Sequence, residues 1–210
     1  MIRRRKLVGY ELFVPFMAAI AREKEKSDNQ ITDAEFKAII SLVFRDTVVS
    51  FMKETKLFRL DIPIDFYKGV QRYDILPPAG YYVEAVIGLR SGRAAVPGDY
   101  TLDERELVLR DCCPDYDLDK AVYAEAALVP LITENVCEFD AEFISRYYDA
   151  IRAGMEYRMY GMVTRTWASG VMMRTRELEY KTLRSKAIRG GTDSSKPVKI
   201  KYRRVSNVMC

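Results

Sequence analysis

The sequence contains no histidine. This absence removes the Ser-His-Asp and Cys-His routes to nucleophilic catalysis, the usual general base near neutral pH and the commonest ligand of transition metals. Cysteine is scarce too, and Cys112, Cys113, Cys137 and Cys210 form no C-x-x-C spacing, which excludes the usual zinc and thioredoxin-like motifs. We therefore expect free thiols in a reducing compartment, no metal and no cofactor. An enzyme of this composition would have to work with carboxylates, Lys, Tyr or Cys alone.

Motifs that bind phosphate or calcium are also missing. The chain has no GxxxxGK[ST] and no GxGxxG, and Gly88–Gly92 lacks the lysine and the following helix that a phosphate cradle needs. The densest carboxylate cluster comprises Asp111, Asp115, Asp117 and Asp119. A calcium loop starting at Asp115 would have Lys120 where glycine turns the chain and Ala126 where a bidentate glutamate is required. We interpret the cluster as a polar turn; a hydrolase using two carboxylates is an alternative that no motif supports.

No apolar run near the N-terminus is long enough to span a membrane. Arg3–Lys6 followed by Leu7–Ala21 has the basic start and apolar stretch of a secretory signal, but Glu11 and Pro15 interrupt it. The longest uncharged run there, Leu12–Ala21, is far shorter than the roughly 20 residues of a membrane span. We expect neither a signal peptide nor a span.

The net charge of +4 is unevenly distributed. Residues 1–6 and 181–210 hold 13 of the 34 basic residues but only one of the 30 acidic residues. Residues 7–180 therefore hold 21 basic and 29 acidic residues, a net charge of −8. Basic ends on an acidic body predict contacts with an acidic protein or with nucleic acid, and the alternative is a pair of solvated charged ends.

A long amphipathic helix is predicted from Thr32 to about Lys56. Thr32 and Glu35 have the spacing of a capping box, with Ile31 and Phe36 as its hydrophobic staple. Apolar residues then recur at helical spacing: Phe36, Ile39, Ile40, Val43, Phe44, Val48, Phe51 and Met52.

Strand periodicity begins at Phe58. Phe58, Leu60, Ile62, Ile64 and Phe66 alternate with less apolar residues, and Pro63 confines this strand to an edge or a bulge. Further short strand-like runs, separated by proline and glycine turns, lie at residues 73–76, 81–90, 99–102, 106–110 and 118–129. Short strands with regular turn signals predict a small sandwich or barrel.

Helical spacing returns after Asp140, a predicted N-cap. One face carries Phe143, Tyr147, Ala150, Ile151, Gly154, Met155 and Met159. After a break at residues 161–167, another helix is predicted from about Ser169 to Arg189, where Gly190 and Gly191 would end it. Within these helices Tyr147, Gly154, Trp167 and Tyr180 are candidate residues for packing or for a subunit interface.

The predicted fold class is therefore α+β. Helices on both sides of a continuous β block are most simply packed together, which gives an α-helical bundle from residues 1–57 and 138–191 with a small inserted antiparallel β-sandwich or barrel-like domain at 58–137. An extended tail, residues 192–210, follows. Its alternating segment would add to a partner's sheet or lie along its surface, through Lys196, Val198, Lys199, Ile200, Lys201, Tyr202, Arg203, Arg204 and Val205.

A series of patterns occurs in order along residues 36–189. Ser50–Thr55 places an aromatic residue before a threonine that closes the first helix. Tyr73–Val83 has a tyrosine and a Leu-Pro pair before a Pro-x-Gly turn and a strand. Pro97–Tyr100 precedes a short strand at Leu107–Leu109, and Ala127–Pro130 leaves the insert.

Later patterns complete the series. Asp149–Met155 has an Ala-Ile-x-x-Gly pattern, and Trp167 precedes the last long helix. In this order the patterns resemble the head-to-tail adaptor family of tailed bacteriophages, ring proteins under the portal that include the tail tubular protein A type. The chain departs from the family at Met155, which replaces a small residue, and at Phe58, which stands alone where an aromatic pair is common.

The resemblance implies a non-enzymatic structural virion protein at the head-tail interface, assembled in the host cytoplasm. It implies a ring, typically dodecameric, between the portal protein and a tail nozzle or tail tube protein, with a channel through which DNA passes without specific binding. It also implies that the C-terminal tail docks on the portal. The alternative is a DNA-binding module that uses Arg3–Lys6 and Lys196–Arg204 as arms on phosphates.

Overall fold

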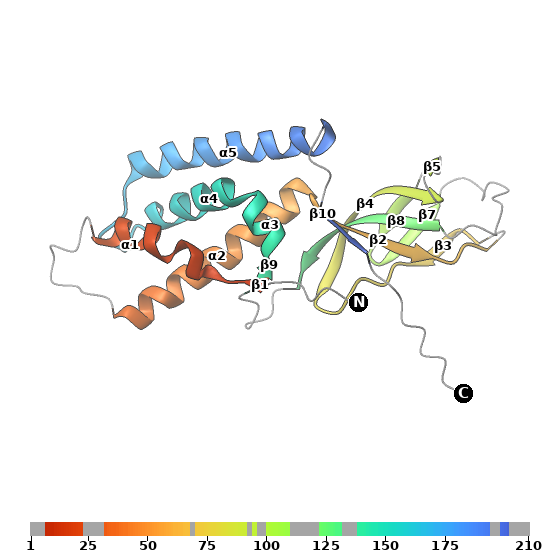
Figure 1. The fold of residues 1–210 in the computed structure, drawn as a ribbon, viewed down its shortest axis with the longest axis horizontal. Coiled ribbons are helices and arrows are strands. Elements are labelled where there is room, and N and C mark those ends of the chain that lie inside the picture. The colour runs from red at the N-terminus through yellow and green to blue at the C-terminus, as the bar shows by residue number, and fades with distance from the viewer. Residues whose placement is uncertain are drawn as a thin grey trace. The chain divides into compact units, whose positions relative to one another are not determined.

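The computed structural model of this 210-residue chain describes residues 7–22, 32–67, 70–91, 94–95, 100–109, 122–131, 138–193 and 198–201 (Figure 1). The chain divides into two compact units. Unit 1 comprises Met1–Thr55 and Ile132–Ser195, and unit 2 comprises Lys56–Leu131 and Lys196–Cys210. The expected domain boundaries, before residues 58 and 138, lie two and six residues later than these divisions. The expected tail is divided between the units.

Unit 1 is mainly helical. Its elements are a short 3-10 helix η1 (Tyr10–Phe13), α1 (Val14–Arg22), α2 (Asp33–Thr55), α3 (Ala141–Arg146), α4 (Tyr148–Tyr160), α5 (Gly170–Asp193) and an antiparallel pair of β1 (Leu7–Val8) with β9 (Phe139–Asp140). Helix α5 lies along α4, and α2 contacts both (Figure 1).

Local capping explains where α2 begins. The Glu35 backbone N–H donates to the Thr32 hydroxyl at 3.2 Å, and the Thr32 backbone N–H donates to the Glu35 carboxylate at 2.9 Å. This reciprocal pair confirms the predicted capping box. The predicted staple partner Ile31 lies outside the described residues. The helix ends at Thr55, and Lys56 has a φ of 54°.

The helices after residue 138 differ from the sequence prediction in two places. Asp140 is confirmed as an N-cap, because its carboxylate accepts from the Phe143 N–H at 3.0 Å. The predicted single helix is wrong, since Tyr147, at φ −112° and ψ 22°, separates α3 from α4. The predicted end at Gly190 and Gly191 is also wrong, because α5 continues to Asp193. Glycine permits a helix to end but costs only about 1 kcal/mol within one.

The N-terminal segment that resembles a secretory signal is a folded part of unit 1. Its buried residues are Phe13, Met17, Ile20 and Ala21. The Phe13 ring stacks on Tyr148 with centroids 4.9 Å apart and lies 5.4 Å from Phe44. Apolar contacts with α2 and α4 therefore hold η1 and α1 in the core of unit 1.

Unit 2 consists of two sheets. The larger sheet has the order β10-β2-β8-β4-β5, and the smaller has the order β3-β7-β6. The strands are β2 (Phe58–Ile64), β3 (Arg72–Asp74), β4 (Tyr81–Ser91), β5 (Ala94–Ala95), β6 (Tyr100–Asp103), β7 (Glu106–Leu109), β8 (Val122–Pro130) and β10 (Val198–Lys201). All described pairs are antiparallel except β10 with β2, which is parallel. The fold is thus a mixed α+β fold with mainly antiparallel sheets.

Strand β2 confirms the predicted alternation. Phe58, Leu60, Ile62 and Ile64 are buried, and the residues between them are partly exposed. The sequence predicts an edge strand or a bulge at Pro63, but β2 lies inside the larger sheet, between β10 and β8. β10 pairs only with Phe58–Asp61, the part of β2 before Pro63. Among the described residues Pro63 therefore lies where β2 has β8 alone as a partner, which suits a residue without an amide hydrogen.

Candidate functional site

The described residues show no metal site and no membrane span. No group of three or more His, Cys, Asp or Glu among them could hold a metal ion, and no helix in that part of the chain is long and apolar enough to cross a membrane. The Asp111–Asp119 cluster lies outside the described residues. The candidate sites are therefore places where helices pack and surfaces that a partner could contact.

Gly154 marks the closest approach of helices in unit 1. A Cβ atom at this position would lie 2.8 Å from Cγ2 of Thr47 on α2 and 2.9 Å from two ring carbons of Tyr180 on α5. Real Cβ atoms essentially never come that close to a neighbour, so only glycine fits without a shift of the helices. The sequence predicted Gly154 as a packing or interface residue, and its contacts are those of packing.

Tyr147 and Tyr180 belong to an aromatic cluster around Phe51. The Phe51 ring centroid is 5.3 Å from that of Tyr147 and 6.4 Å from that of Tyr180. Both tyrosines are buried. Burial raises the pKa of Tyr180, and this effect exceeds the opposite effect of the Arg158 charge. Because one chain already covers both rings, they pack the helices of unit 1.

Trp167 anchors the connection between α4 and α5. Its side chain is only 3% exposed. Its ring meets Phe36 of α2 edge-on at 6.2 Å, and the Arg165 guanidinium lies 5.9 Å from its centroid. These contacts of Trp167 are with residues of its own chain.

A buried carboxylate that the sequence analysis missed ties α4 to α5. Glu156 is 4% exposed, and its carboxylate lies 2.8 Å from Nε of Arg152 and 2.7 Å from Nε of Arg176. Two partly exposed arginines therefore compensate one buried charge. The four-residue spacing of Arg152 and Glu156 was visible in the sequence, but nothing there placed Arg176 of α5 beside them.

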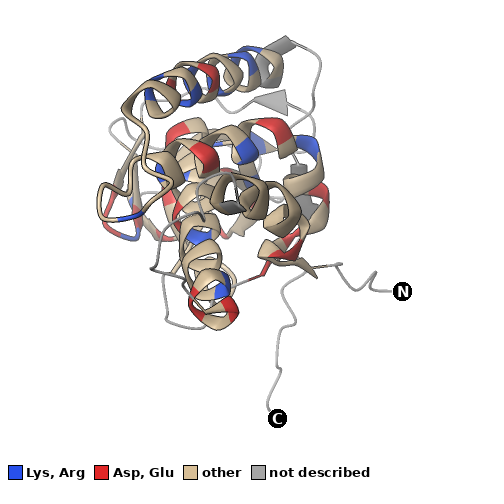
Figure 2. Cartoon of the chain, turned by 90° about the vertical axis from the view of Figure 1, so that its left-hand side faces the viewer, with Lys and Arg blue, Asp and Glu red and all other residues tan. Residues whose placement is uncertain are grey.

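One side of α5 is an uncovered helix surface in the described part of unit 1. From Gly170 to Gly190 only Tyr180 is buried. Val171 and Leu178, seven residues apart and so on one face, are 76% and 67% exposed. The helix carries six basic and three acidic residues, interspersed as Figure 2 shows for the helices of this unit. This face of α5 is a candidate contact surface for another protein.

Part of the basic C-terminal end belongs to this folded helix. Lys181 pairs with Glu177 at 2.6 Å, and Arg184 pairs with Glu54 of α2. These cations support unit 1 and are not arms for a partner. Residues 194–210, which follow α5, hold five basic and no acidic residues.

Strand β10 contains four of the predicted portal-binding residues. Val198, Lys199, Ile200 and Lys201 pair in register with Phe58, Arg59, Leu60 and Asp61 of β2. The structure thus pairs this alternating segment with a strand of its own chain. The other predicted tail residues, Lys196 and Tyr202–Val205, lie outside the described residues.

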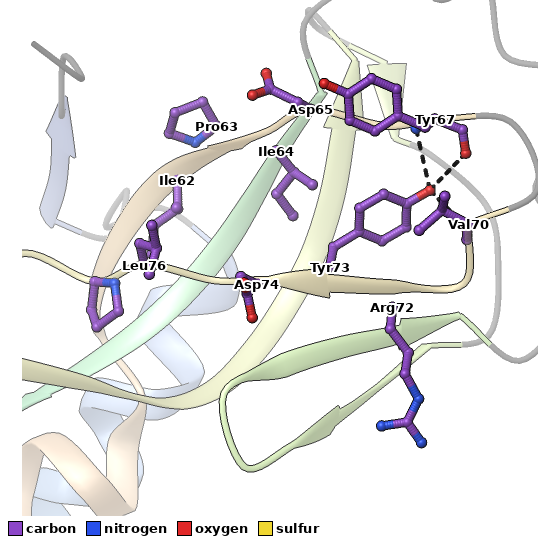
Figure 3. A pocket seen from close by; sticks show the side chains of 11 residues that line it. Ile62, Pro63, Ile64, Asp65, Tyr67, Val70, Arg72, Tyr73, Asp74 and Leu76 are labelled. Atoms are coloured by element: carbon purple, nitrogen blue, oxygen red, sulfur yellow. Dashed lines mark hydrogen bonds between the residues drawn. The ribbon is translucent and has the colours of Figure 1, made fainter. Parts of the chain in front are cut away.

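An open pocket of about 410 Å³ lies between β2 and the β3 segment (Figure 3). Its lining comprises Ile62, Pro63, Ile64, Asp65, Tyr67, Val70, Arg72, Tyr73, Asp74, Leu76 and Pro77. The Tyr73 hydroxyl accepts from the Tyr67 N–H at 3.4 Å and lies 2.7 Å from the Val70 carbonyl oxygen, to which it can donate. Tyr73 thereby fixes the rim of the pocket. No motif or spacing in the sequence indicates a pocket here.

Comparisons with known proteins add no relative: no family model matches the chain, and a search of curated proteins found no significant match.

Proposed function

We propose that this protein is a head-to-tail adaptor of a tailed bacteriophage, a structural virion protein that forms a ring between portal and tail. The observation that carries the proposal is the chain order of the two units. A helical unit is interrupted after Thr55 by a β unit and resumes at Ile132. We propose that the helices form a bundle and that unit 2 is a small β-sandwich borne by it, as the resemblance to the adaptor family implies.

The structural roles of the family-like patterns support the proposal. The segment from Tyr73 to Gly80 leads from β3 into β4, and Gly80 has a φ of 83°, which favours glycine at that turn. Ala127–Pro130 ends β8, directly before the chain returns to unit 1. Gly154 allows the close helix approach that an Ala-Ile-x-x-Gly pattern would require.

The charge distribution also suits a DNA channel. Residues 1–6 and 194–210 together hold nine basic residues and no acidic residue. Residues 7–193 therefore hold 25 basic and 30 acidic residues, a net charge of −5. An acidic body repels phosphates over a Debye length of about 8–10 Å. Such a body would let DNA pass without binding it.

The exposed face of α5 is the surface we propose for contacts between ring subunits. Val171 and Leu178 supply the exposed apolar area for such a contact. The tail, residues 194–210, is the proposed portal contact. Both contacts would form in the host cytoplasm during assembly of the virion.

Co-sedimentation with the portal protein of the same phage tests this tail contact. Deletion of residues 202–210 retains β10, so we expect a folded protein that no longer sediments with the portal. Deletion of residues 1–6, the other basic end, is the matched control and should leave sedimentation unchanged. If both deletion variants sediment with the portal equally well, the result contradicts the portal contact of the tail.

The alternative is a DNA-binding module, which the basic residues of segments 1–6 and 194–210 favour. Several phosphate contacts would make the affinity for duplex DNA fall steeply between about 50 and 200 mM salt. An adaptor should show little affinity for duplex DNA at either salt concentration. A salt titration of DNA binding therefore separates the two functions.

A further inference from the structure

We propose that the pocket between β2 and the β3 segment binds Tyr202–Val205 of the same chain. The occupant is thus a short extended peptide with one aromatic and two arginine side chains, attached directly to β10. This site goes beyond the adaptor function and does not depend on it.

The register of β10 brings the next residues to the pocket. β10 runs parallel to β2, and Lys201 pairs with Asp61. A chain that continues in this direction advances about 3.3 Å per residue, as β2 does. The residues after Lys201 therefore pass Ile62, Pro63, Ile64 and Asp65 in turn, and all four line the pocket.

Pro63 determines how this segment would be held. Because proline has no amide hydrogen, a parallel ladder that continued past it would lack one backbone hydrogen bond. Side-chain contacts in a pocket beside β2 can then hold the residues beyond Lys201. The pocket begins where the β10 ladder ends, at Ile62.

The lining matches the chemistry of the segment. Tyr67 and Leu76 are 63% and 60% exposed, so they offer apolar surface to the Tyr202 ring. Asp65 and Asp74 add two carboxylates (Figure 3) that oppose the charges of the two arginines.

One cation also lines the pocket, but acidic neighbours already compensate it. Arg72 lies 2.8 Å from the Glu106 carboxylate and 3.5 Å from that of Asp103, which raises its pKa. The pocket therefore favours a basic occupant over an acidic one.

The segment Tyr202–Val205 is covalently attached to β10, which favours binding within one chain over binding between two chains. Since β10 is already paired with β2, the next four residues need no loop to reach the pocket, and their effective concentration is high. In the proposed adaptor this segment would rest on unit 2 until a portal displaced it.

Charge reversal in the full-length chain tests the site through amide hydrogen exchange of β10. The tail variant carries Arg203→Glu and Arg204→Glu, and the pocket variant carries Asp65→Lys and Asp74→Lys. Each should speed exchange of the Val198–Lys201 amides about fivefold, because exposed charge pairs are worth up to about 1 kcal/mol. The combined variant should restore protection to within about twofold, since the pairs are re-formed with opposite signs.

Two controls keep the result interpretable. Glu104→Lys, on the β6–β7 turn and outside this pocket, should leave exchange of β10 unchanged. The Ala124–Ala127 amides of β8 report whether each variant keeps the sheet.

Several results would overturn the proposal. One is a pocket variant in which the β8 amides stay protected and the exchange rate of the β10 amides does not change. Another is a combined variant whose β10 amides exchange as fast as those of the tail variant or the pocket variant alone. Protection that rises with protein concentration would show that the segment comes from a second copy and would overturn the assignment to the same chain.

Discussion

A Cβ atom on Gly154 would lie 2.8 Å from Cγ2 of Thr47, so glycine is the only residue that fits between α4 and α2 at this point. The same Cβ atom would lie 2.9 Å from two ring carbons of Tyr180 on α5. Three helices therefore meet at one glycine. Their spacing depends on the absence of a side chain there.

Gly154→Ala should destabilise unit 1 by about 1–3 kcal/mol, because the added methyl group overpacks a site that the Thr47 methyl group and the Tyr180 ring already fill. Urea unfolding followed by Trp167 fluorescence measures the effect. Thr47→Ser removes the closer methyl group and keeps the hydroxyl that donates to the Val43 carbonyl at 2.6 Å. This second change should recover part of the loss.

Gly170→Ala is the matched control for Gly154→Ala. Nothing lies within 4 Å of a Cβ atom at Gly170, the first residue of α5. This variant should be neutral or slightly stabilising, since alanine restricts the unfolded chain. Equal effects of the two substitutions would contradict close packing at Gly154.

Glu156→Gln should cost about 1–3 kcal/mol, because it removes the charge that compensates Arg152 and Arg176 between α4 and α5. Glu179→Gln changes an exposed partner of the same Arg176 and should cost less than about 0.5 kcal/mol. Urea unfolding of both variants gives the comparison. A larger loss for Glu179→Gln would mean that the buried carboxylate does not join the helices.

Trp167, the only tryptophan, should report selectively on unit 1. Because its side chain is buried, we expect blue-shifted emission and little quenching by iodide in the folded protein. Unfolding should shift the emission to the red and open the ring to iodide. Native emission that iodide quenches as strongly as free tryptophan would contradict the burial of Trp167.

Acid should remove the contribution of the Glu35 carboxylate to the α2 cap. Backbone and side-chain hydrogen bonds from Thr32 lower the pKa of Glu35 below its ordinary value of 4.5. A lowered folded-state pKa means that the contribution is present above pH 4.5 and is lost as the pH falls through the folded-state pKa. The difference in melting temperature between wild type and Thr32→Ala should therefore narrow below pH 4.5. A difference that widens in acid would refute the role of the charged form.

Local signals explain which elements the sequence predicted well. The capping box of Thr32 and Glu35, the cap at Asp140 and the alternation along β2 each depend on residues a few positions apart. Helix α1 was missed although Phe13, Met17 and Ile20 have helical spacing, because Glu11 and Pro15 suggested an interrupted run.

Contacts between distant residues explain what the sequence could not predict. Strand β10 pairs with β2, which lies far from it in the sequence. Arg176 of α5 forms an ion pair with Glu156 of α4. No periodicity or spacing encodes either contact. The sequence places Gly154 on the apolar face of a predicted helix and in a family-like pattern, but the steric reason for glycine there depends on Thr47 and Tyr180 from two other helices.

Electron microscopy of the purified protein, alone and mixed with the portal protein of the same phage, tests the central claim most directly. The adaptor function predicts dodecameric rings that cap the portal along a common axis. A chain that stays monomeric in both samples, with bare portals beside it, would contradict the function.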